Sequence, residues 1–169
     1  MLTDAIRLLL FPALMAFAAS SDLLTMTISN RLSLALAGGF FLLTLVVGMS
    51  LAAVGMHLAA AALVLVISFG FFSQGWIGGG DAKLYAAASL WLGWNMLLEY
   101  TLIASLLGGA LALALLALRR APLPAMLHGQ AWLLHLADKQ AGIPYGVALA
   151  AAALILLPQS EFFRLAAGG

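Results

Sequence analysis

The chain has 169 residues, of which 65% are apolar and 8% are charged. An ordinary soluble domain has about a quarter of its residues charged, so this composition excludes that class and indicates a single membrane domain over residues 1–169. Seven Lys and Arg against six Asp and Glu exclude intrinsic disorder and a basic nucleic-acid-binding surface. The chain contains no cysteine, which excludes disulfides and Cys-ligated metal clusters.

The positions of the charges divide the chain into spans. A transmembrane helix needs about 20 mostly apolar residues. Residues 32–80 contain no charged residue, which is too long for one crossing, and we expect a turn at Gly48–His57. Residues 84–118 contain one charge, Glu99, and we expect a second turn at Gly93–Glu99. The sequence therefore predicts an all-α, polytopic integral membrane protein with about six transmembrane helices, near residues 5–23, 32–50, 55–73, 82–97, 100–118 and 142–158.

The segment 119–140 is a long polar connection. It begins with Arg119 and Arg120, ends near Lys139, and contains several Leu and a Trp between them. We predict a cytoplasmic loop that contains an amphipathic helix on the membrane surface. His128 and His135 are seven residues apart with no Cys nearby, so we expect no metal site here.

Six crossings predict the orientation of the chain. They place the connections 22–31, 74–83 and 119–139 on one side of the membrane and both termini on the other. Five of the seven basic residues belong to these connections, which places the connections in the cytoplasm by the positive-inside rule. Trp91, Trp94 and Tyr100 are then expected at the opposite interface as an aromatic belt.

Two of the six acidic residues cannot be explained simply by hydration at a turn or terminus. Asp22 ends the first predicted crossing, and Asp81 begins the fourth on the same predicted face. Two carboxylates brought together there can share a proton, so that one activates water while the other protonates a carbonyl oxygen. The alternative is that each caps a helix end. The three glycines 78–80 favour the first interpretation, because they permit a close approach of another backbone beside Asp81.

Three motifs around these residues resemble those of one family. Residues 78–83 read Gly-Gly-Gly-Asp-Ala-Lys and match the Gly-x-Gly-Asp-x-Lys pattern of the prepilin peptidases, which are membrane aspartyl proteases that process type IV pilin-like precursors. Asp22 with Ile28 and Asn30 resembles the segment of the other catalytic aspartate. Residues 143–146, Ile-Pro-Tyr-Gly, are similar to the signature that opens the last helix. The three motifs in this order extend over nearly the whole chain.

The resemblance implies that Asp22 and Asp81 form the catalytic pair. The enzyme would then remove a short basic leader from prepilins or pseudopilins at the cytoplasmic face of the bacterial inner membrane, without a metal or cofactor. Substrates of the family are typically cut after a Gly, with a Glu near the fifth mature position. The chain lacks the cysteine-rich insertion of the larger bifunctional members, so it resembles the compact peptidases of tight-adherence, or Flp, pilus systems, and N-methyltransferase activity is not implied.

The same motifs supply candidate substrate-binding or supporting residues. Lys83 either attracts an acid of the substrate and tunes Asp81, or acts as a topology signal. Asn30 either orients Asp22 or caps a helix. Ser29 precedes it, where the family often has Pro. Each of the remaining candidates either contacts the substrate or has a structural role in its turn or helix. They are Gly78, Gly80, Pro144, Tyr145 and Gly146.

Two other function classes remain open from the sequence. A small membrane transporter or pilus-assembly scaffold could use buried acids to conduct protons or join helices. Against transport, the predicted crossings 32–50 and 55–73 are almost wholly apolar. A presenilin-like intramembrane protease shares the Gly-x-Gly-Asp element, but its other aspartate is expected in a Tyr-Asp context, and here Ser21 precedes Asp22.

Overall fold

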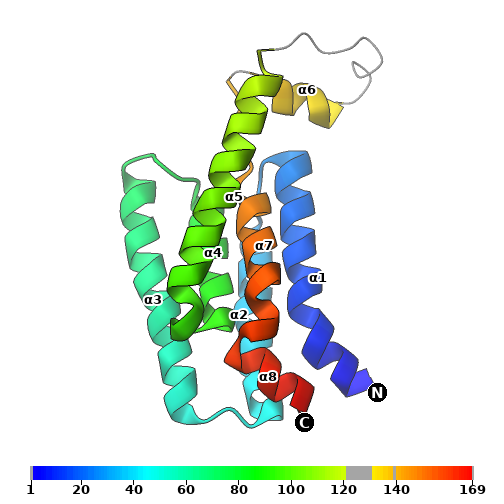
Figure 1. The fold of residues 1–169 in the computed structure, drawn as a ribbon, viewed down its shortest axis with the longest axis vertical. Coiled ribbons are helices and arrows are strands. Elements are labelled where there is room, and N and C mark those ends of the chain that lie inside the picture. The colour runs from blue at the N-terminus through cyan, green and yellow to red at the C-terminus, as the bar shows by residue number, and fades with distance from the viewer. Residues whose placement is uncertain (1, 121–130, 139, 169) are drawn as a thin grey trace.

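The computed structural model describes residues 2–120, 131–138 and 140–168, and the regular elements among them are helices (Figure 1). Two short 3-10 turns, η1 and η3, join longer helices. The elements are α1 (Leu2–Thr25), α2 (Asn30–Val47), α3 (Leu51–Ser73), α4 (Gly79–Leu92), η1 (Trp94–Met96), α5 (Leu97–Leu118), α6 (Ala131–Ala137), α7 (Tyr145–Leu156), η3 (Leu157–Gln159) and α8 (Glu161–Gly168).

The structure supports the all-helical membrane fold, but it does not confirm the count of six crossings. Among the described residues, four helical segments are long and apolar enough to cross a membrane, and α7 with η3 and α8 forms a fifth if this pair, bent by 53°, is one span. The predicted crossing 82–97 is instead the 14-residue α4, about 21 Å long and therefore shorter than a bilayer core of about 30 Å. It ends early because Gly93 adopts φ +79° and turns the chain into η1.

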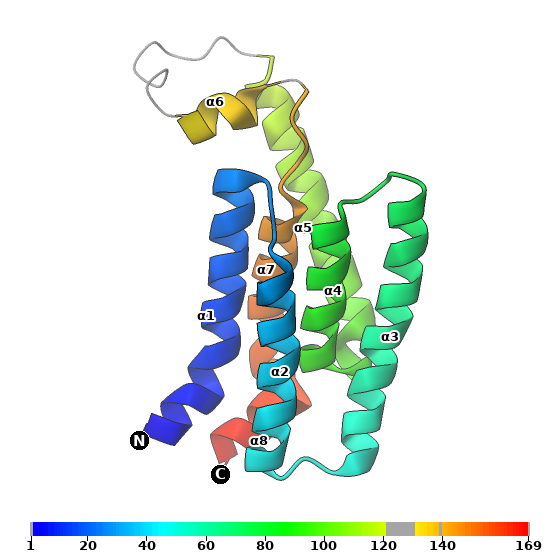
Figure 2. The ribbon, with the colours of Figure 1, turned by 180° about the vertical axis from the view of Figure 1, so that it is seen from behind.

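The predicted arrangement of the connections is confirmed. The α1–α2 and α3–α4 connections lie at one end of the helical bundle, together with α6, and both termini lie at the other end (Figures 1 and 2). Most residues of the candidate spans are not buried inside the bundle, as expected for helices that face lipid. Asp22 and Asp81, which lie beside these two connections, are therefore at the same end of the bundle.

Local signals set the boundary between α2 and α3. Gly48 ends α2 in the left-handed conformation, with φ +69°, and Ser50 caps α3 by accepting a hydrogen bond from the Ala53 backbone N–H. The turn is therefore confined to residues 48–50, and the prediction that it extends to His57 is wrong. Gly55 lies inside α3 with open space around it, so this glycine does not interrupt the helix.

The prediction for His57 is corrected because tertiary packing buries this residue. Its side chain is 2% exposed, and its Nδ1 lies 2.7 Å from the Leu90 carbonyl oxygen at the end of α4. A Cβ atom added to Gly93 would lie 2.7 Å from His57 Nε2. A glycine is therefore needed at position 93 for two reasons: the backbone has a positive φ there, and the imidazole of His57 leaves no room for a side chain.

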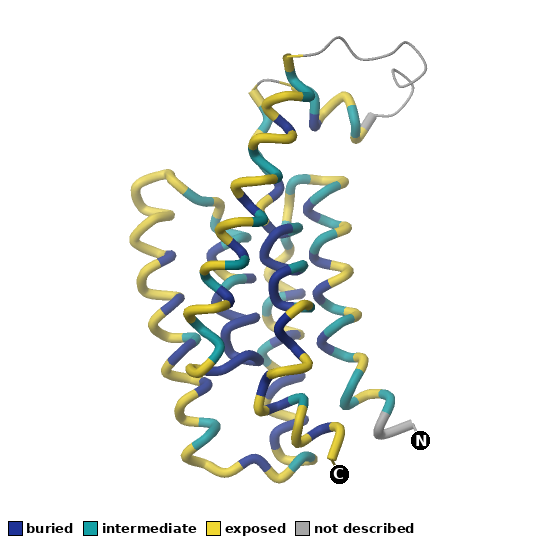
Figure 3. Tube along the Cα trace, viewed as in Figure 1, coloured by how far each residue is buried: buried dark blue, intermediate teal, exposed yellow. Residues whose placement is uncertain are grey.

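The core lies around α4 and α7, which are the most buried elements in Figure 3. Helix α7 packs against α1, α4 and α5, while α4 also packs against α2 and α3. The predicted aromatic belt is wrong for Trp91 and Tyr100, which are fully buried and donate hydrogen bonds to the Leu36 and Leu149 carbonyl oxygens. Trp94 is 43% exposed. The buried rings satisfy their polar atoms within the bundle, so they pack as core residues.

The long connection contains the predicted helix. Helix α6 lies across the end of the bundle (Figure 1), and residues 121–130, which include His128, lie outside the described residues. Arg119 at the end of α5 donates hydrogen bonds to the Leu136 carbonyl at 2.9 Å and the Gly142 carbonyl at 2.7 Å. Arg119 is therefore more than a topology charge, because its guanidinium joins α6 and the segment before α7 to α5.

Candidate active site

Asp22 lies in the last turn of α1, and its side chain is 4% exposed. The backbone N–H of Gly146, in the first turn of α7, donates a hydrogen bond to Asp22 Oδ2 at 2.7 Å. A helix N-terminus has free N–H groups and a partial positive charge. The fold therefore satisfies this buried carboxylate with a charge-assisted hydrogen bond from a residue 124 positions away.

Gly146 lies so close to Asp22 that a larger residue does not fit. An added Cβ atom would lie 2.7 Å from Asp22 Oδ2 and 2.7 Å from Ile28 Cδ1. Both distances are far below ordinary van der Waals contact. The glycine of the Pro-Tyr-Gly motif thus permits the contact between the start of α7 and the carboxylate.

Ile28 belongs to the turn between α1 and α2, which side-chain hydroxyls hold in place. Met26 adopts φ +53°, and Ser21 Oγ donates to the Thr27 carbonyl at 2.8 Å. Ser29 caps α2 by accepting from the Leu32 backbone N–H. The φ of Ser29 is −72°, which is the value that a proline imposes, so the turn keeps a geometry that the family's Pro would also allow.

Asp81 lies in the first turn of α4, after the three glycines. A Cβ atom at Gly78 would lie 3.0 Å from Asp81 Oδ2, and one at Gly80 would lie 3.1 Å from Ile28 Cβ and 3.5 Å from the Ile28 backbone. The glycines therefore do permit close approach, as predicted, and the segment that approaches Gly80 is the α1–α2 turn. Ile28 consequently lies between Gly80 and Gly146 and links the surroundings of the two aspartates.

Asp81 interacts electrostatically with Asp22. Burial, and after it the negative charge of Asp22, raise the pKa of Asp81 to about 6, while the backbone N–H groups of Gly78 and Gly146 act in the opposite direction. The Gly146 amide thus acts on both carboxylates. Two acids that influence each other in this way titrate as a pair. The structure brings together the two residues that the sequence singled out.

Lys83 and Asn30 bind each other. Lys83 Nζ donates to Asn30 Oδ1 at 2.8 Å, and both residues line a cavity between α2, α3 and α4. Ser29, not Asn30, caps α2, so the capping alternative for Asn30 is wrong. Lys83 and Asn30 together tie the starts of α4 and α2 to each other.

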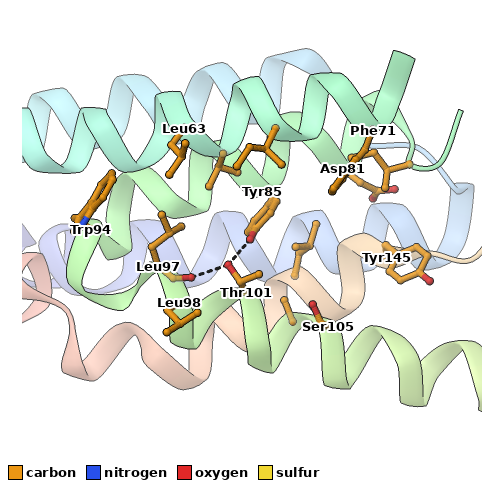
Figure 4. Close-up of a pocket in the computed structure, with 15 residues that line it drawn as sticks. Leu63, Phe71, Asp81, Tyr85, Trp94, Leu97, Leu98, Thr101, Ser105 and Tyr145 are labelled. Atoms are coloured by element: carbon orange, nitrogen blue, oxygen red, sulfur yellow. Dashed lines mark hydrogen bonds between the residues drawn. The ribbon is translucent and has the colours of Figure 1, made fainter. Parts of the chain in front are cut away.

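Asp81 also opens onto a second cavity, of about 630 Å³, between α3, α4, α5 and α7. Figure 4 shows Asp81 and Tyr145 at one end of it and Trp94 at the other. Pro144 precedes α7 at its N-cap, and the ring of Tyr145 packs against Gly108 of α5, where an added Cβ would lie 2.8 Å from Tyr145 Cε1. Tyr145 therefore both joins α7 to α5 and lines the cavity.

Two residues of this cavity are not among those predicted from the sequence. Tyr85 and Thr101 line it and their hydroxyl groups are hydrogen-bonded to each other. Tyr85 follows Asp81 by four residues, which places it on the same face of α4. That spacing is a signal in the sequence, but Thr101 on α5 has none, because only the packing of α5 against α4 brings it there.

The comparisons with known proteins agree with these motifs. The family model of the type IV leader peptidase family matches residues 9–113, a range that includes Asp22 and Asp81. Neither the curated proteins nor the solved structures contain a significant match. The match covers more than half of the chain and both aspartate segments, and the chain therefore belongs to the type IV leader peptidase family.

Proposed function

We propose that this protein is a membrane aspartyl endopeptidase that removes the leader peptide from type IV prepilins at the cytoplasmic face of the membrane. The observation that carries the proposal is the convergence of Asp22 and Asp81 at the Gly146 amide. Their helices, α1 and α4, are distant in the sequence, and Asp81 faces a cavity that can receive a substrate. Two adjacent carboxyl groups of this kind can hydrolyse a peptide bond without a nucleophilic side chain.

The two environments suggest different roles for the two carboxyl groups. Asp22, ionised and held by Gly146, takes a proton from a water molecule whose oxygen attacks the carbonyl carbon of the substrate. Asp81, whose raised pKa of about 6 leaves a fraction of it protonated near neutral pH, donates its proton to the carbonyl oxygen. When the tetrahedral intermediate collapses, Asp22 gives its proton to the leaving nitrogen and a hydroxyl of the intermediate returns a proton to Asp81. Both groups end in their starting states.

The charges at this end of the bundle support the cytoplasmic side. Arg31 and Lys83 lie beside the connections that carry the two aspartates, and Arg119 and Arg120 follow α5 at the same end of the bundle. The positive-inside rule assigns such an end to the cytoplasm. A precursor with a basic leader would meet the site there, with the apolar segment that follows the leader in the membrane.

The short connections between the helices support a specific pilus system. The 169 residues of the chain contain no cysteine and no large insertion between the helices. We therefore infer a compact peptidase for Flp-type prepilins, for which methyltransferase activity is not implied.

The test is to coexpress the chain with a pilin-like precursor and to measure the mass of the precursor. Loss of mass equal to the leader, with one cleavage site, is the expected result. An intact precursor alongside correctly inserted protein would overturn the peptidase proposal and favour the alternative of a transporter or assembly scaffold.

A further inference from the structure

Arg119 closes the base of the connection between α5 and α7. It is the half-buried C-cap residue of α5. Its Nε donates a hydrogen bond to the Leu136 carbonyl oxygen at 2.9 Å, and its Nη2 donates one to the Gly142 carbonyl oxygen at 2.7 Å. The last carbonyl groups of a helix have no partner within it, and those of α6 include that of Leu136. One side chain therefore satisfies backbone acceptors in two segments that the chain reaches after leaving α5.

The segment 142–146, which leads from this contact to the active site, is short and internally fixed. The backbone N–H of Tyr145 donates to the carbonyl oxygen two residues before it at 2.8 Å. Pro144 is buried, and its ring fixes φ, which is −75° here. The segment ends at Gly146, whose backbone N–H donates to Asp22 Oδ2 at 2.7 Å. A displacement at the start of this segment is therefore carried to the donor at its end.

Two contacts join the start of α7 to α5. The ring of Tyr145 packs against Gly108, and Arg119 binds the Gly142 carbonyl. Gly108 and Arg119 are eleven residues apart in the sequence, which is about 16 Å along a helix. One contact alone would let the segment before α7 pivot about it. The second contact removes that freedom.

The two arginines that follow α5 differ in what they contact. Arg119 makes the two hydrogen bonds described above, whereas Arg120 is exposed and its side chain forms no hydrogen bond with the described part of the chain. A topology signal needs only a positive charge at this end of the bundle, and both residues supply one. Only Arg119 uses the geometry of its planar guanidinium, which holds two donors in a fixed fork as an ammonium group does not.

We propose that Arg119 is a positioning residue for the hydrolysis, because it fixes the segment before α7 and so holds the Gly146 backbone N–H against the Asp22 carboxylate. This inference rests on the proposed function. Arg119 acts through the backbone and contributes no group to the reaction itself. Without its contact, the carboxylate keeps its place on α1 but its donor is no longer aligned. The chemical step then slows, while binding of the precursor is largely kept.

The experiment measures kcat and KM of the purified protein for a pilin-like precursor, in Arg119→Gln, Arg119→Lys and the matched control Arg120→Gln. Both Arg119 variants should lower kcat by about tenfold to a hundredfold with little change in KM, as expected when a catalytic group is misplaced by about 1 Å. The lysine keeps the charge, so its loss of activity separates geometry from charge. Arg120→Gln should stay near the wild-type values. Wild-type kcat in either Arg119 variant would overturn the inference.

The pH dependence separates a positioning role from poorer folding. The Gly146 backbone N–H lowers the pKa of Asp81, against burial and the charge of Asp22, which raise it. When Arg119 no longer holds that amide in place, the pH at which the cleavage rate falls should move above about 6, whereas in Arg120→Gln it should not move. A smaller folded fraction lowers the rate equally at every pH. An unchanged midpoint in Arg119→Gln would contradict the inference.

A chemical tether tests the contact through a gain of activity. Gly142 is exposed, and nothing lies within 4 Å of an added Cβ. Arg119→Cys combined with Gly142→Cys therefore introduces two thiols into a chain that contains no cysteine. A reducible bifunctional thiol reagent that spans the length of an arginine side chain should restore most of the lost kcat, and reduction should remove it again. Each single variant with the same reagent is the control. Complete tethering without a gain in kcat would overturn the inference.

Two further outcomes identify which idea has failed. Cleavage that survives Asp81→Asn would contradict the proposed function itself. A protein that requires Asp81 for cleavage, but keeps the wild-type kcat and pH dependence after Arg119→Gln, would contradict only this inference.

Discussion

The Gly146 backbone N–H donates to Asp22 Oδ2 at 2.7 Å and so connects the start of α7 to the end of α1. The same amide acts on Asp81 of α4. Three helices from the beginning, middle and end of the chain therefore meet at one backbone donor. The Pro-Tyr-Gly motif contributes a structural part of the site, and its glycine has no room for a side chain.

The first prediction concerns the two carboxyl groups. Asp22→Asn and Asp81→Asn should each abolish leader cleavage nearly completely, because an amide can neither accept a proton from water nor donate one as an acid does. The double variant should be little worse than either single one, since groups that act as a unit are not additive. Cleavage is measured by the mass of a coexpressed precursor, with membrane insertion of each variant checked.

The matched controls for this prediction are acids away from the site. Glu99→Gln and Glu161→Gln change residues in the first turns of α5 and α8, and Asp138→Asn changes one that follows α6. All three should keep most of the activity. Substantial cleavage by an inserted Asp22 or Asp81 variant would exclude the dyad.

The second prediction concerns the space at Gly146. Gly146→Ala should inactivate the protein and destabilise it by about 1–3 kcal/mol, because the added Cβ overlaps both Asp22 and Ile28. Gly109→Ala is the matched control: nothing lies within 4 Å of its added Cβ, and it should stabilise α5 by about 0.5–1 kcal/mol. Thermal unfolding in detergent and precursor cleavage check the pair. A fully active Gly146→Ala protein would disprove the close approach.

The third prediction concerns pH. The proposed mechanism begins with a protonated Asp81, and burial together with the charge of Asp22 raises its pKa to about 6. The cleavage rate should therefore fall as the pH rises through about 6, as Asp81 loses its proton. The test is to measure the cleavage rate of the purified enzyme below and above this pH. A rate that does not change through this range would argue against Asp81 as the acid.

The fourth prediction follows from the same pair. Asp22→Asn removes the neighbouring negative charge, so the titration midpoint of Asp81 should move below about 6. The infrared band of the protonated carboxyl group reports this midpoint, and Asp81→Asn identifies the band. An unchanged midpoint would show that the two carboxyl groups do not interact.

The fifth prediction concerns topology. Gln74 lies in the α3–α4 connection and Gln159 in η3 near the opposite end, and both are exposed. Cysteines introduced singly at these positions, in a chain that has none of its own, should react with an impermeant reagent from opposite sides of the membrane, with Gln159→Cys labelled from outside. Labelling of both from one side would contradict the shared cytoplasmic end.

The sequence predicted those features that depend on composition or on neighbouring residues. Its apolar composition indicated a membrane protein, and its charges grouped the connections of Asp22 and Asp81 at one end, as Figures 1 and 2 show. The glycines before Asp81 indicated a close backbone approach. These signals are local, because hydropathy, charge and φ preferences belong to a short stretch of chain.

Only the tertiary structure decided which residues meet across the bundle. Helices that are apolar on all sides have no periodic pattern to mark the buried face, so the sequence placed Trp91 and Tyr100 in an interfacial belt and His57 in a turn, whereas all three are buried. For the same reason it did not reveal that Thr101 binds Tyr85 beside the cavity. The carboxylate of Asp22 and the amide of Gly146 are 124 positions apart, and only the packing of α7 against α1 brings them into contact.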